Sequence, residues 1–279
     1  MTHWFSGDGG LRLAADLFGP EEGAPVLLIG GMGQTRHSWR RVALRLADRG
    51  YRAITLDFRG HGESDRAPDG DYSYPRQIAD LAAVARQVGR PLVLAGNSLG
   101  GKISLATAGT CGAEVCAALV LVDAVPRSNP GGIANVAKSN QMRADGFETL
   151  DEAARQIAEG RGQPFAPGDG ERLRRNMRQD AEGRWHWHWD AGYRDPRHQI
   201  GLGAGTEWLQ SIAGNVKVPV LLAWCELSEV VDGDGIAALK AEIPHLEVEI
   251  IPGAHHMIVG DENDVFADAL IGFLERHAL

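Results

Sequence analysis

Residues 95–101 read Ala95-Gly96-Asn97-Ser98-Leu99-Gly100-Gly101. This stretch follows the apolar run Pro91-Leu92-Val93-Leu94 and precedes residues 102–108, whose pattern predicts a helix. A serine flanked by glycines at a strand-to-helix turn is typical of a nucleophile elbow, because side chains beside the serine would clash with the crowded strand and helix. We therefore predict that Ser98 is a catalytic nucleophile and that the N–H of Leu99 donates to an oxyanion.

Apolar runs and amphipathic segments alternate on both sides of this turn. Continuous apolar runs separated by helices favour a parallel sheet that is covered on both faces. The alternation stops at residue 126, after the run Ala117–Val122 and the acid Asp123, and it resumes at residue 206. We therefore predict an α/β core from residues 1–125 and 206–279, with residues 126–205 inserted as a cap.

A serine hydroxyl is a poor nucleophile at neutral pH and needs a nearby base together with a group that orients the base. In doubly wound sheets, reactive groups gather beyond the carboxyl ends of the strands. The last predicted strand ends in Ile250-Ile251, and His255 and His256 follow it closely. We assign His256 as the base and keep His255 as the alternative.

Several carboxylates follow predicted strands and could orient the histidine. After the apolar run at 220–224 the chain carries Glu229, Asp232 and Asp234, and Asp123 follows an earlier strand. We assign Glu229, and we keep Asp123 and Asp232 as alternatives.

The loop after the apolar run at 26–29 contains Gly30, Gly31 and Gly33. Glycines let the backbone approach a substrate oxygen closely, so we predict the N–H of Met32 as the second oxyanion donor beside that of Leu99.

Taken together, these pieces resemble the α/β-hydrolase superfamily. The matching segments are residues 30–39, 57–64, 96–101, 253–257 and 260–266, in the order found in the family. The resemblance implies an α/β-hydrolase fold: a mostly parallel eight-stranded sheet with helices on both faces and a helical cap inserted after the sixth strand. It also implies the chain order nucleophile, acid, histidine, and it identifies residues 57–64 as a turn that shapes the floor of the site. The branch that looks closest contains esterases, non-haem peroxidase-like proteins and carbon–carbon bond hydrolases.

Aromatic residues gather near the end of the predicted cap. Trp185, Trp187 and Trp189 alternate with histidines, which places the indole rings on one face of an extended segment. With Tyr193 they either line an apolar substrate pocket or pack the cap onto the core. The His-x-His-x-Asp spacing also suits a metal, but the serine mechanism needs neither a metal nor a cofactor, so we predict none.

Composition limits the partners. The 279 residues carry a formal net charge of −9 and no basic stripe, which disfavours a nucleic acid or an anionic membrane as the partner. Three cysteines in apolar or helical contexts are typical of buried thiols in a reducing compartment. With no apolar run long enough for a membrane span or a secretion signal, we expect a cytoplasmic protein with a small-molecule substrate.

The expected activity is hydrolysis of a carboxylic ester or lactone of a small to medium hydrophobic substrate through an acyl-enzyme. The same residues could instead cleave a carbon–carbon bond next to a ketone or use peroxide as the acceptor. A non-catalytic receptor that keeps the pocket but has lost turnover is the alternative of another class.

Overall fold

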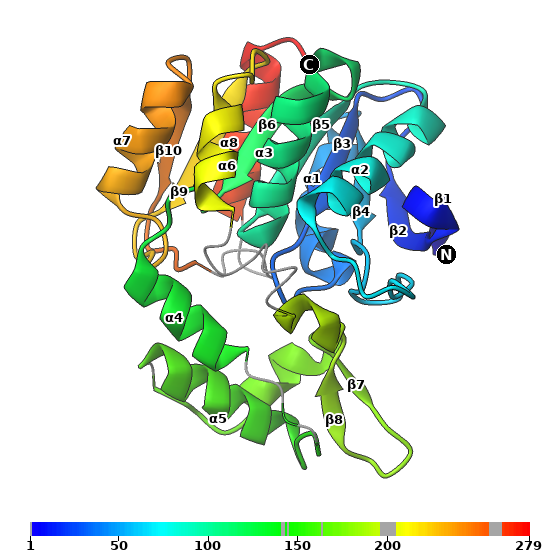
Figure 1. Ribbon diagram of the computed structural model, residues 1–279, viewed down its shortest axis with the longest axis vertical. Helices are drawn as coiled ribbons and strands as arrows, with labels where there is room; N and C mark the ends of the chain where they lie inside the picture. Colours follow the sequence, from blue (N-terminus) through cyan, green and yellow to red (C-terminus); the bar gives the residue numbers. More distant parts are fainter. Residues whose placement is uncertain (1, 141–142, 144, 163, 196–204, 257–263) are drawn as a thin grey trace.

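The computed structural model describes residues 2–140, 143, 145–162, 164–195, 205–256 and 264–279. Its central sheet has eight strands in the order β1-β2-β4-β3-β5-β6-β9-β10, and Figure 1 shows the sheet with its helices. The pairs β1–β2 and β2–β4 are antiparallel and the other neighbours are parallel. The predicted mostly parallel sheet is therefore confirmed. The strands are β1 (His3–Ser6), β2 (Arg12–Phe18), β3 (Pro25–Ile29), β4 (Arg52–Leu56), β5 (Leu92–Asn97), β6 (Cys116–Val122), β9 (Val220–Cys225) and β10 (Glu247–Ile251).

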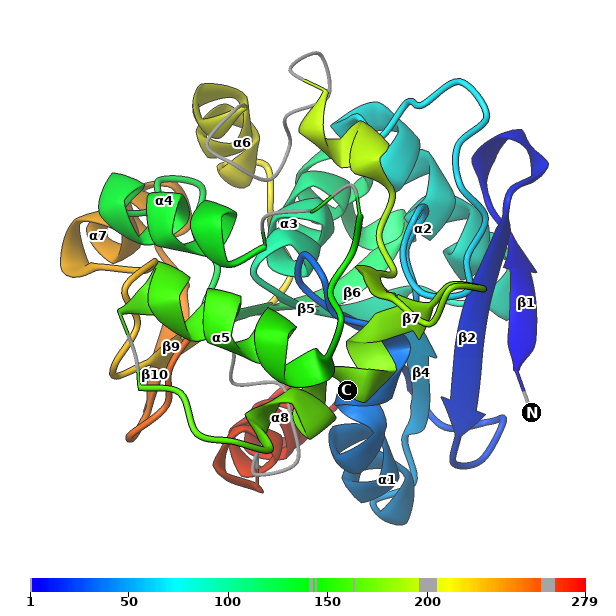
Figure 2. The same cartoon turned by 90° about the horizontal axis from the view of Figure 1, so that it is seen from below.

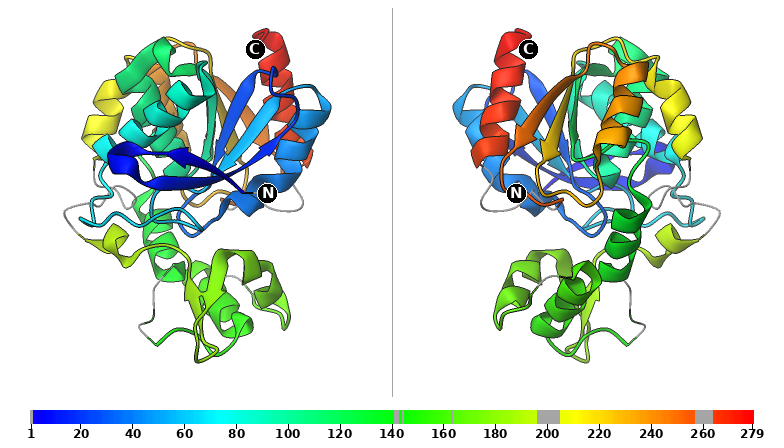
Figure 3. Two further views of the ribbon diagram at one scale, coloured as in Figure 1. Left: turned by 90° about the vertical axis from the view of Figure 1, so that its right-hand side faces the viewer. Right: turned by 90° about the vertical axis from the view of Figure 1, so that its left-hand side faces the viewer.

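Helices cover both faces of the sheet (Figure 3). One face carries two helices and the other carries four, and each layer has its own apolar core. The first pair is α1 (Arg40–Asp48) and α8 (Asp264–Arg276), and the second set is α2 (Tyr74–Val88), α3 (Leu99–Cys111), α6 (Thr206–Ala213) and α7 (Gly233–Glu242).

The central strands supply both cores. β3 is buried along its whole length, as expected for a parallel strand with helices on each side. Val26 and Leu28 join the core with α1 and α8, whereas Leu27 and Ile29 join the core with α2 and α3. This division follows from the alternation of side chains along a strand. Because six neighbouring strands are parallel, their carboxyl ends meet at one edge of the sheet.

The segment between β6 and α6 lies beyond that edge (Figure 1). In the view from below, α4 and α5 lie in front of the strand ends (Figure 2). Side chains of Asn129 and Thr149 cap the starts of α4 and α5. The segment holds α4 (Pro130–Ser139), α5 (Leu150–Arg161), a 3₁₀ helix (Asp169–Asn176), β7 (Met177–Gln179), β8 (Trp185–Trp187) and a 3₁₀ turn (Ala191–Arg194). We keep the name cap for residues 126–205, and its status as a separate unit stays a prediction.

Local signals located most elements. The predicted helix at 102–108 lies within α3, and residues 36–48 form a 3₁₀ turn (Arg36–Trp39) followed by α1. Two further short 3₁₀ helices, Asp8–Gly10 and Gly112–Glu114, lie in connections. Among the helices that the structure describes, none is long and apolar enough to cross a membrane.

Candidate active site

Ser98 lies at the turn between β5 and α3. Its backbone has φ 52° and ψ −115°, a conformation that residues with side chains seldom adopt and that is typical of strained functional turns. The glycines around it are required by space. A Cβ on Gly96 would lie 2.3 Å from the carbonyl carbon of Gly100, and a Cβ on Gly100 would lie 2.5 Å from the carbonyl oxygen of Gly30. The strand, turn and helix thus have the arrangement that the sequence predicts.

His256 lies in the loop after β10, and its Nε2 is 2.9 Å from Oγ of Ser98. The residue is buried, with 2% of its surface exposed, whereas His255 is exposed. Nδ2 of Asn97 donates to the carbonyl oxygens of Val122 and His256, at 3.0 and 3.3 Å, and so ties the histidine loop to the end of β5. Of the two neighbouring histidines, His256 is the one that meets the serine.

The carboxylate beside His256 belongs to Asp123, not to the preferred Glu229. Oδ2 of Asp123 is 2.6 Å from Nδ1 of His256, and Asp123 is fully buried. Glu229 is half-buried in the loop after β9 and has no hydrogen bond to His256 among the described contacts. Asp232 caps α7, where it accepts from the N–H of Gly235 at 2.8 Å. The assignment of Glu229 is therefore corrected in favour of the alternative Asp123.

The physical reason lies in the sheet. β6 and β9 are parallel neighbours, so Asp123 and the loop after β9 lie next to each other. Asp123 has φ 48°, a left-handed conformation at the end of its strand. From there its carboxylate also accepts from the N–H of Cys225 at 3.1 Å and from the hydroxyl of Ser228 at 2.6 Å. The loop after β9 thus supplies donors to the acid instead of the acid itself.

Sequence reasoning missed Ser228. Its hydroxyl accepts from the N–H groups of Val230 and Val231, at 3.1 and 3.0 Å, while it donates to Asp123. The signal in the sequence was a hydroxyl residue three positions after the end of β9, close to the candidate acids Glu229 and Asp232.

The predicted oxyanion loop packs against the serine. A Cβ on Gly31 would lie 3.1 Å from Cβ of Ser98, so the loop approaches the nucleophile as closely as only glycine permits. The side chain of Gln34 accepts from the N–H of Gly31 at 2.6 Å and holds the loop. In the part of the chain that the structure describes, the N–H groups of Met32 and Leu99 donate to no other protein atom. Their role as oxyanion donors stays a prediction.

His61 forms a hydrogen bond with the same loop. Its Nε2 accepts from the N–H of Gly33 at 3.4 Å. Burial lowers the pKa of His61 to about 3, so the ring is neutral at pH 7 and can accept. The ring packs against Phe58 at a centroid distance of 3.9 Å with the planes tilted by 31°, within the segment 57–64 predicted as the floor of the site.

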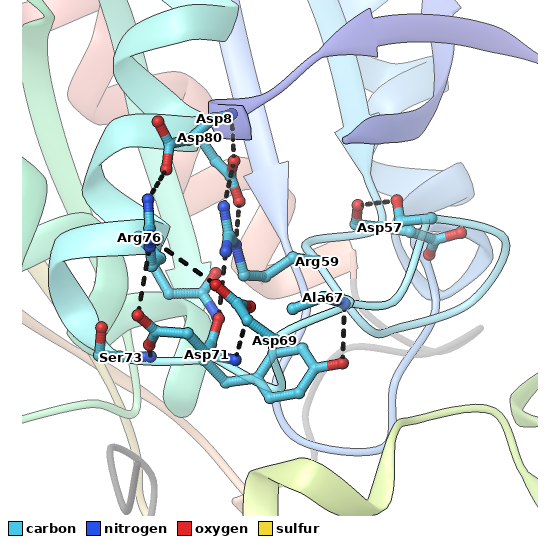
Figure 4. A network of polar contacts seen from close by, with 12 residues as sticks. Asp8, Asp57, Arg59, Ala67, Asp69, Asp71, Ser73, Arg76 and Asp80 are labelled. Carbon is cyan, nitrogen blue, oxygen red and sulfur yellow. Dashed lines mark hydrogen bonds and ion pairs between the residues drawn. The ribbon is translucent and has the colours of Figure 1, made fainter. Parts of the chain in front are cut away.

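Two buried ion pairs fix this floor. Nη1 of Arg36 lies 2.6 Å from Oδ2 of Asp57, and Arg59 bonds to Asp80 through Nε at 2.6 Å and Nη2 at 2.8 Å. Figure 4 shows Arg59 and Asp80 beside a second, more exposed cluster around Arg76. Because each buried charge is paired and hydrogen-bonded, we interpret these groups as structural.

The tryptophan segment is extended, as predicted, since Trp185–Trp187 forms β8 and pairs antiparallel with β7. Trp187 and Trp189 are buried and Trp185 is half-buried. Nε1 of Trp189 would lie 3.8 Å from a Cβ on Gly33, so this indole lies over the oxyanion loop. His186 bonds to Asp180 at 2.7 Å.

Tyr193 connects the cap to the core. Its hydroxyl donates to the carbonyl oxygen of Arg59 at 2.8 Å and lies 2.5 Å from Nε2 of Gln77. Its ring stacks on Tyr72 at 4.2 Å. These contacts are those of packing between cap and core, and a substrate contact for the four aromatic residues Trp185, Trp187, Trp189 and Tyr193 stays a prediction.

A cavity of about 670 Å³ lies beside the cap, between α4 and the starts of α6 and α7. None of Ser98, Asp123 and His256 lines it. The contacts of Ser98, Asp123 and His256 at the sheet edge are therefore separate from this cavity. The segment 257–263, which carries part of the sequence resemblance, lies outside the described residues.

Comparisons with known proteins bear on the family and the fold. The chain is 26% identical over 262 residues to a 2-(acetamidomethylene)succinate hydrolase of Mesorhizobium japonicum, covering 91% of this chain and 90% of the relative. It is 27% identical to a putative non-heme chloroperoxidase of Synechocystis, covering 91% and 92%. The crystal structure of an alpha/beta hydrolase from Novosphingobium aromaticivorans superposes with a TM-score of 0.80 at 27% identity, covering 99% and 98%.

The family model described as the alpha/beta hydrolase fold matches residues 24–262, which is most of the chain. Together with the sheet order and the elbow, this match shows that the chain belongs to the alpha/beta hydrolase fold family.

Proposed function

We propose that this protein is a serine hydrolase that cleaves a carboxylic ester or lactone of a small to medium hydrophobic substrate through an acyl-enzyme. The observation that carries the proposal is the continuous chain of contacts from Asp123 through His256 to Ser98, at 2.6 and 2.9 Å. A nucleophile bonded to a base that is bonded to an orienting carboxylate is the arrangement that activates a hydroxyl.

In this mechanism Oγ of Ser98 attacks the ester carbonyl while Nε2 of His256 takes its proton. The buried carboxylate of Asp123 keeps the proton of the neutral ring on Nδ1 and stabilises the imidazolium that forms. The N–H groups of Met32 and Leu99 stabilise the oxyanion, and each contributes about 3 kcal/mol to lowering the barrier. His256 then protonates the leaving alcohol, and a water activated by the same ring hydrolyses the acyl-enzyme.

The apolar substrate class rests on the aromatic side of the site. The indole of Trp189 lies against the oxyanion loop, and Trp187 is buried beside Phe147 at a centroid distance of 6.4 Å. If these rings line the substrate site, as predicted, they favour a hydrophobic group on the substrate.

Labelling with a fluorophosphonate probe tests the proposal directly. We expect the wild-type protein to be labelled and Ser98→Ala to remain unlabelled, with Ser211→Ala on the exposed face of α6 as the matched control that keeps its labelling. Hydrolysis of p-nitrophenyl esters should follow the same order. A folded wild-type protein that resists the probe and leaves the esters intact would be a receptor without turnover, contrary to the proposal.

A peroxide acceptor is the second candidate, because the Synechocystis relative is named as a chloroperoxidase and is matched over nearly its whole length. The acyl-enzyme would then pass its acyl group to hydrogen peroxide in place of water. Measuring peracid and free acid from one ester at increasing peroxide separates the two outcomes. A vinylogous diketone in the same panel detects carbon–carbon cleavage.

A further inference from the structure

Lys102 is a buried cation that the serine mechanism does not use. Only 5% of its surface is exposed, although it lies in the first turns of α3 next to the nucleophile. Within the described part of the chain, its ammonium has no hydrogen-bond or ion-pair partner. Lysines are seldom buried without a partner, because removing the charge from water costs free energy that no internal contact returns here.

Helix geometry places Lys102 close to Ser98. The N–H of Lys102 donates to the carbonyl oxygen of Ser98 at 3.0 Å, so the two residues are one helical turn apart, a rise of about 5–6 Å. Side chains of a helix lean toward its N-terminus, so the lysine chain extends back toward the elbow.

The neighbouring residues fix the face of α3 that carries Lys102. A Cβ on Gly100 would meet the carbonyl oxygen of Gly30, and a Cβ on Gly101 would meet Ala124, so these two residues face the sheet. Gly109, seven residues after Lys102 and therefore on its face, lies against Ile212 of α6. Lys102 thus faces away from the sheet, on the side where α6 follows the end of the cap.

The amine of Lys102 keeps at most a small contact with accessible space. Nζ of Lys102 is not among the described side-chain nitrogens that are both sealed from solvent and without a partner. Burial lowers the pKa of Lys102 to about 8, which leaves most of the population charged at pH 7. With no protein partner described for it, a charged amine one helical turn from Ser98 can pair with a group that enters from outside.

We propose that Lys102 binds a carboxylate on the acyl part of the substrate, so that the preferred substrates are half-esters of dicarboxylic acids. This inference rests on the proposed function, since it concerns the ester that Ser98 cleaves. The backbones of Ser98 and Lys102 are one helical turn apart, a distance of the order that an acyl chain of about four to six carbons spans. The net charge of −9 repels anions from the protein as a whole, so a local cation is what makes such a substrate bindable.

The test compares matched pairs of p-nitrophenyl esters: the hemisuccinate with the butyrate, the hemiglutarate with the valerate and the hemiadipate with the hexanoate. Each pair has the same acyl length and differs by the terminal carboxylate. For at least one pair we expect Lys102→Met to lower the ratio of anionic to neutral kcat/KM by about 30-fold, mainly through KM, because a charged hydrogen bond is lost. Lys102→Arg should retain most of the ratio.

Lys240→Met, which removes an exposed lysine from α7, is the control for the loss of one positive charge from the surface. It should leave every ratio within twofold of wild type. If no pair changes its ratio in Lys102→Met, or if Lys240→Met changes it equally, Lys102 does not bind the substrate. If the wild type hydrolyses neutral esters but Lys102→Met keeps the wild-type ratios, only this inference is overturned. If the wild type neither hydrolyses esters nor reacts with the fluorophosphonate, the proposed function is overturned.

Discussion

Two buried charges near Ser98 are treated in opposite ways. The carboxylate of Asp123 meets three donors, namely the ring of His256, the N–H of Cys225 and the hydroxyl of Ser228. The ammonium of Lys102 has no partner in the described part of the molecule. In the proposed mechanism, the charge that orients the histidine is hydrogen-bonded before substrate arrives, whereas the charge proposed to bind substrate has no described protein partner and therefore costs stability.

The largest expected effect on activity comes from changing Asp123, the carboxylate with three hydrogen-bond donors. Asp123→Asn should lower kcat/KM for p-nitrophenyl esters by about 10³- to 10⁴-fold, because an amide N–H toward Nδ1 favours the wrong ring tautomer and leaves Nε2 unable to accept the proton of Ser98. Steady-state kinetics on the folded variant, with circular dichroism to confirm the fold, checks this. An Asp123→Asn variant within tenfold of wild type would show that another group orients His256.

The unpaired ammonium of Lys102 should lower the free energy of unfolding. Lys102→Met should raise the free energy of unfolding at pH 7 by about 3 kcal/mol, because a pKa lowered from 10.5 to about 8 means that burial disfavours the charged form by about 1.4 kcal/mol per pH unit. Urea denaturation of the two proteins measures the difference. An unchanged or lower stability for Lys102→Met would mean that the ammonium has a stabilising partner.

The pH dependence sharpens the same contrast. Between pH 8 and 10.5 the unfolded chain binds more protons at Lys102 than the folded chain does, so this residue makes stability rise with pH in that window. The advantage of Lys102→Met should therefore shrink as pH increases from about 8 and be nearly absent near pH 10.5. Urea midpoints at several pH values follow it, and an advantage that is constant across the window would contradict the assigned cause.

A smaller effect is expected where one of the three donors to Asp123 is removed. Ser228→Ala should lower kcat by about tenfold with little change in KM, because the carboxylate loses one charged hydrogen bond worth about 1.5 kcal/mol and holds His256 less firmly. Ser228→Thr, which keeps the hydroxyl, should recover most of the activity. Equal losses in both variants would point to packing and not to the hydrogen bond.

The smallest effect belongs to the carboxylate that the sequence favoured. Glu229→Gln should leave kcat/KM within twofold of wild type, since Glu229 has no described bond to His256. It is the matched counterpart of Asp123→Asn, with the same chemical change one strand away. A loss of tenfold or more would return the orienting role to the loop after β9.

The fold and the candidate site differ in how much of each could be predicted from the sequence. Ser98, His256 and the parallel sheet have local signals, because glycine spacing, apolar runs and a histidine after the last strand all depend on neighbours in the chain. The acid has no such signal. Asp123 and Glu229 both follow buried strands, and only the pairing of β6 with β9, roughly 100 residues apart, decides which carboxylate meets the ring. Lys102 escaped notice because burial on a helix beside glycines cannot be read from its own residue type.

Ser98 and Asp123 share positive φ angles of 52° and 48°, and each such residue costs about 1–3 kcal/mol relative to relaxed backbone. Glycine tolerates these angles, so a chain screened only for heat resistance can gain stability by replacing the proposed nucleophile or its proposed acid with glycine. Directed evolution for thermostability on this scaffold should therefore retain a turnover screen in every round, since robustness and reactivity compete here at the same two positions.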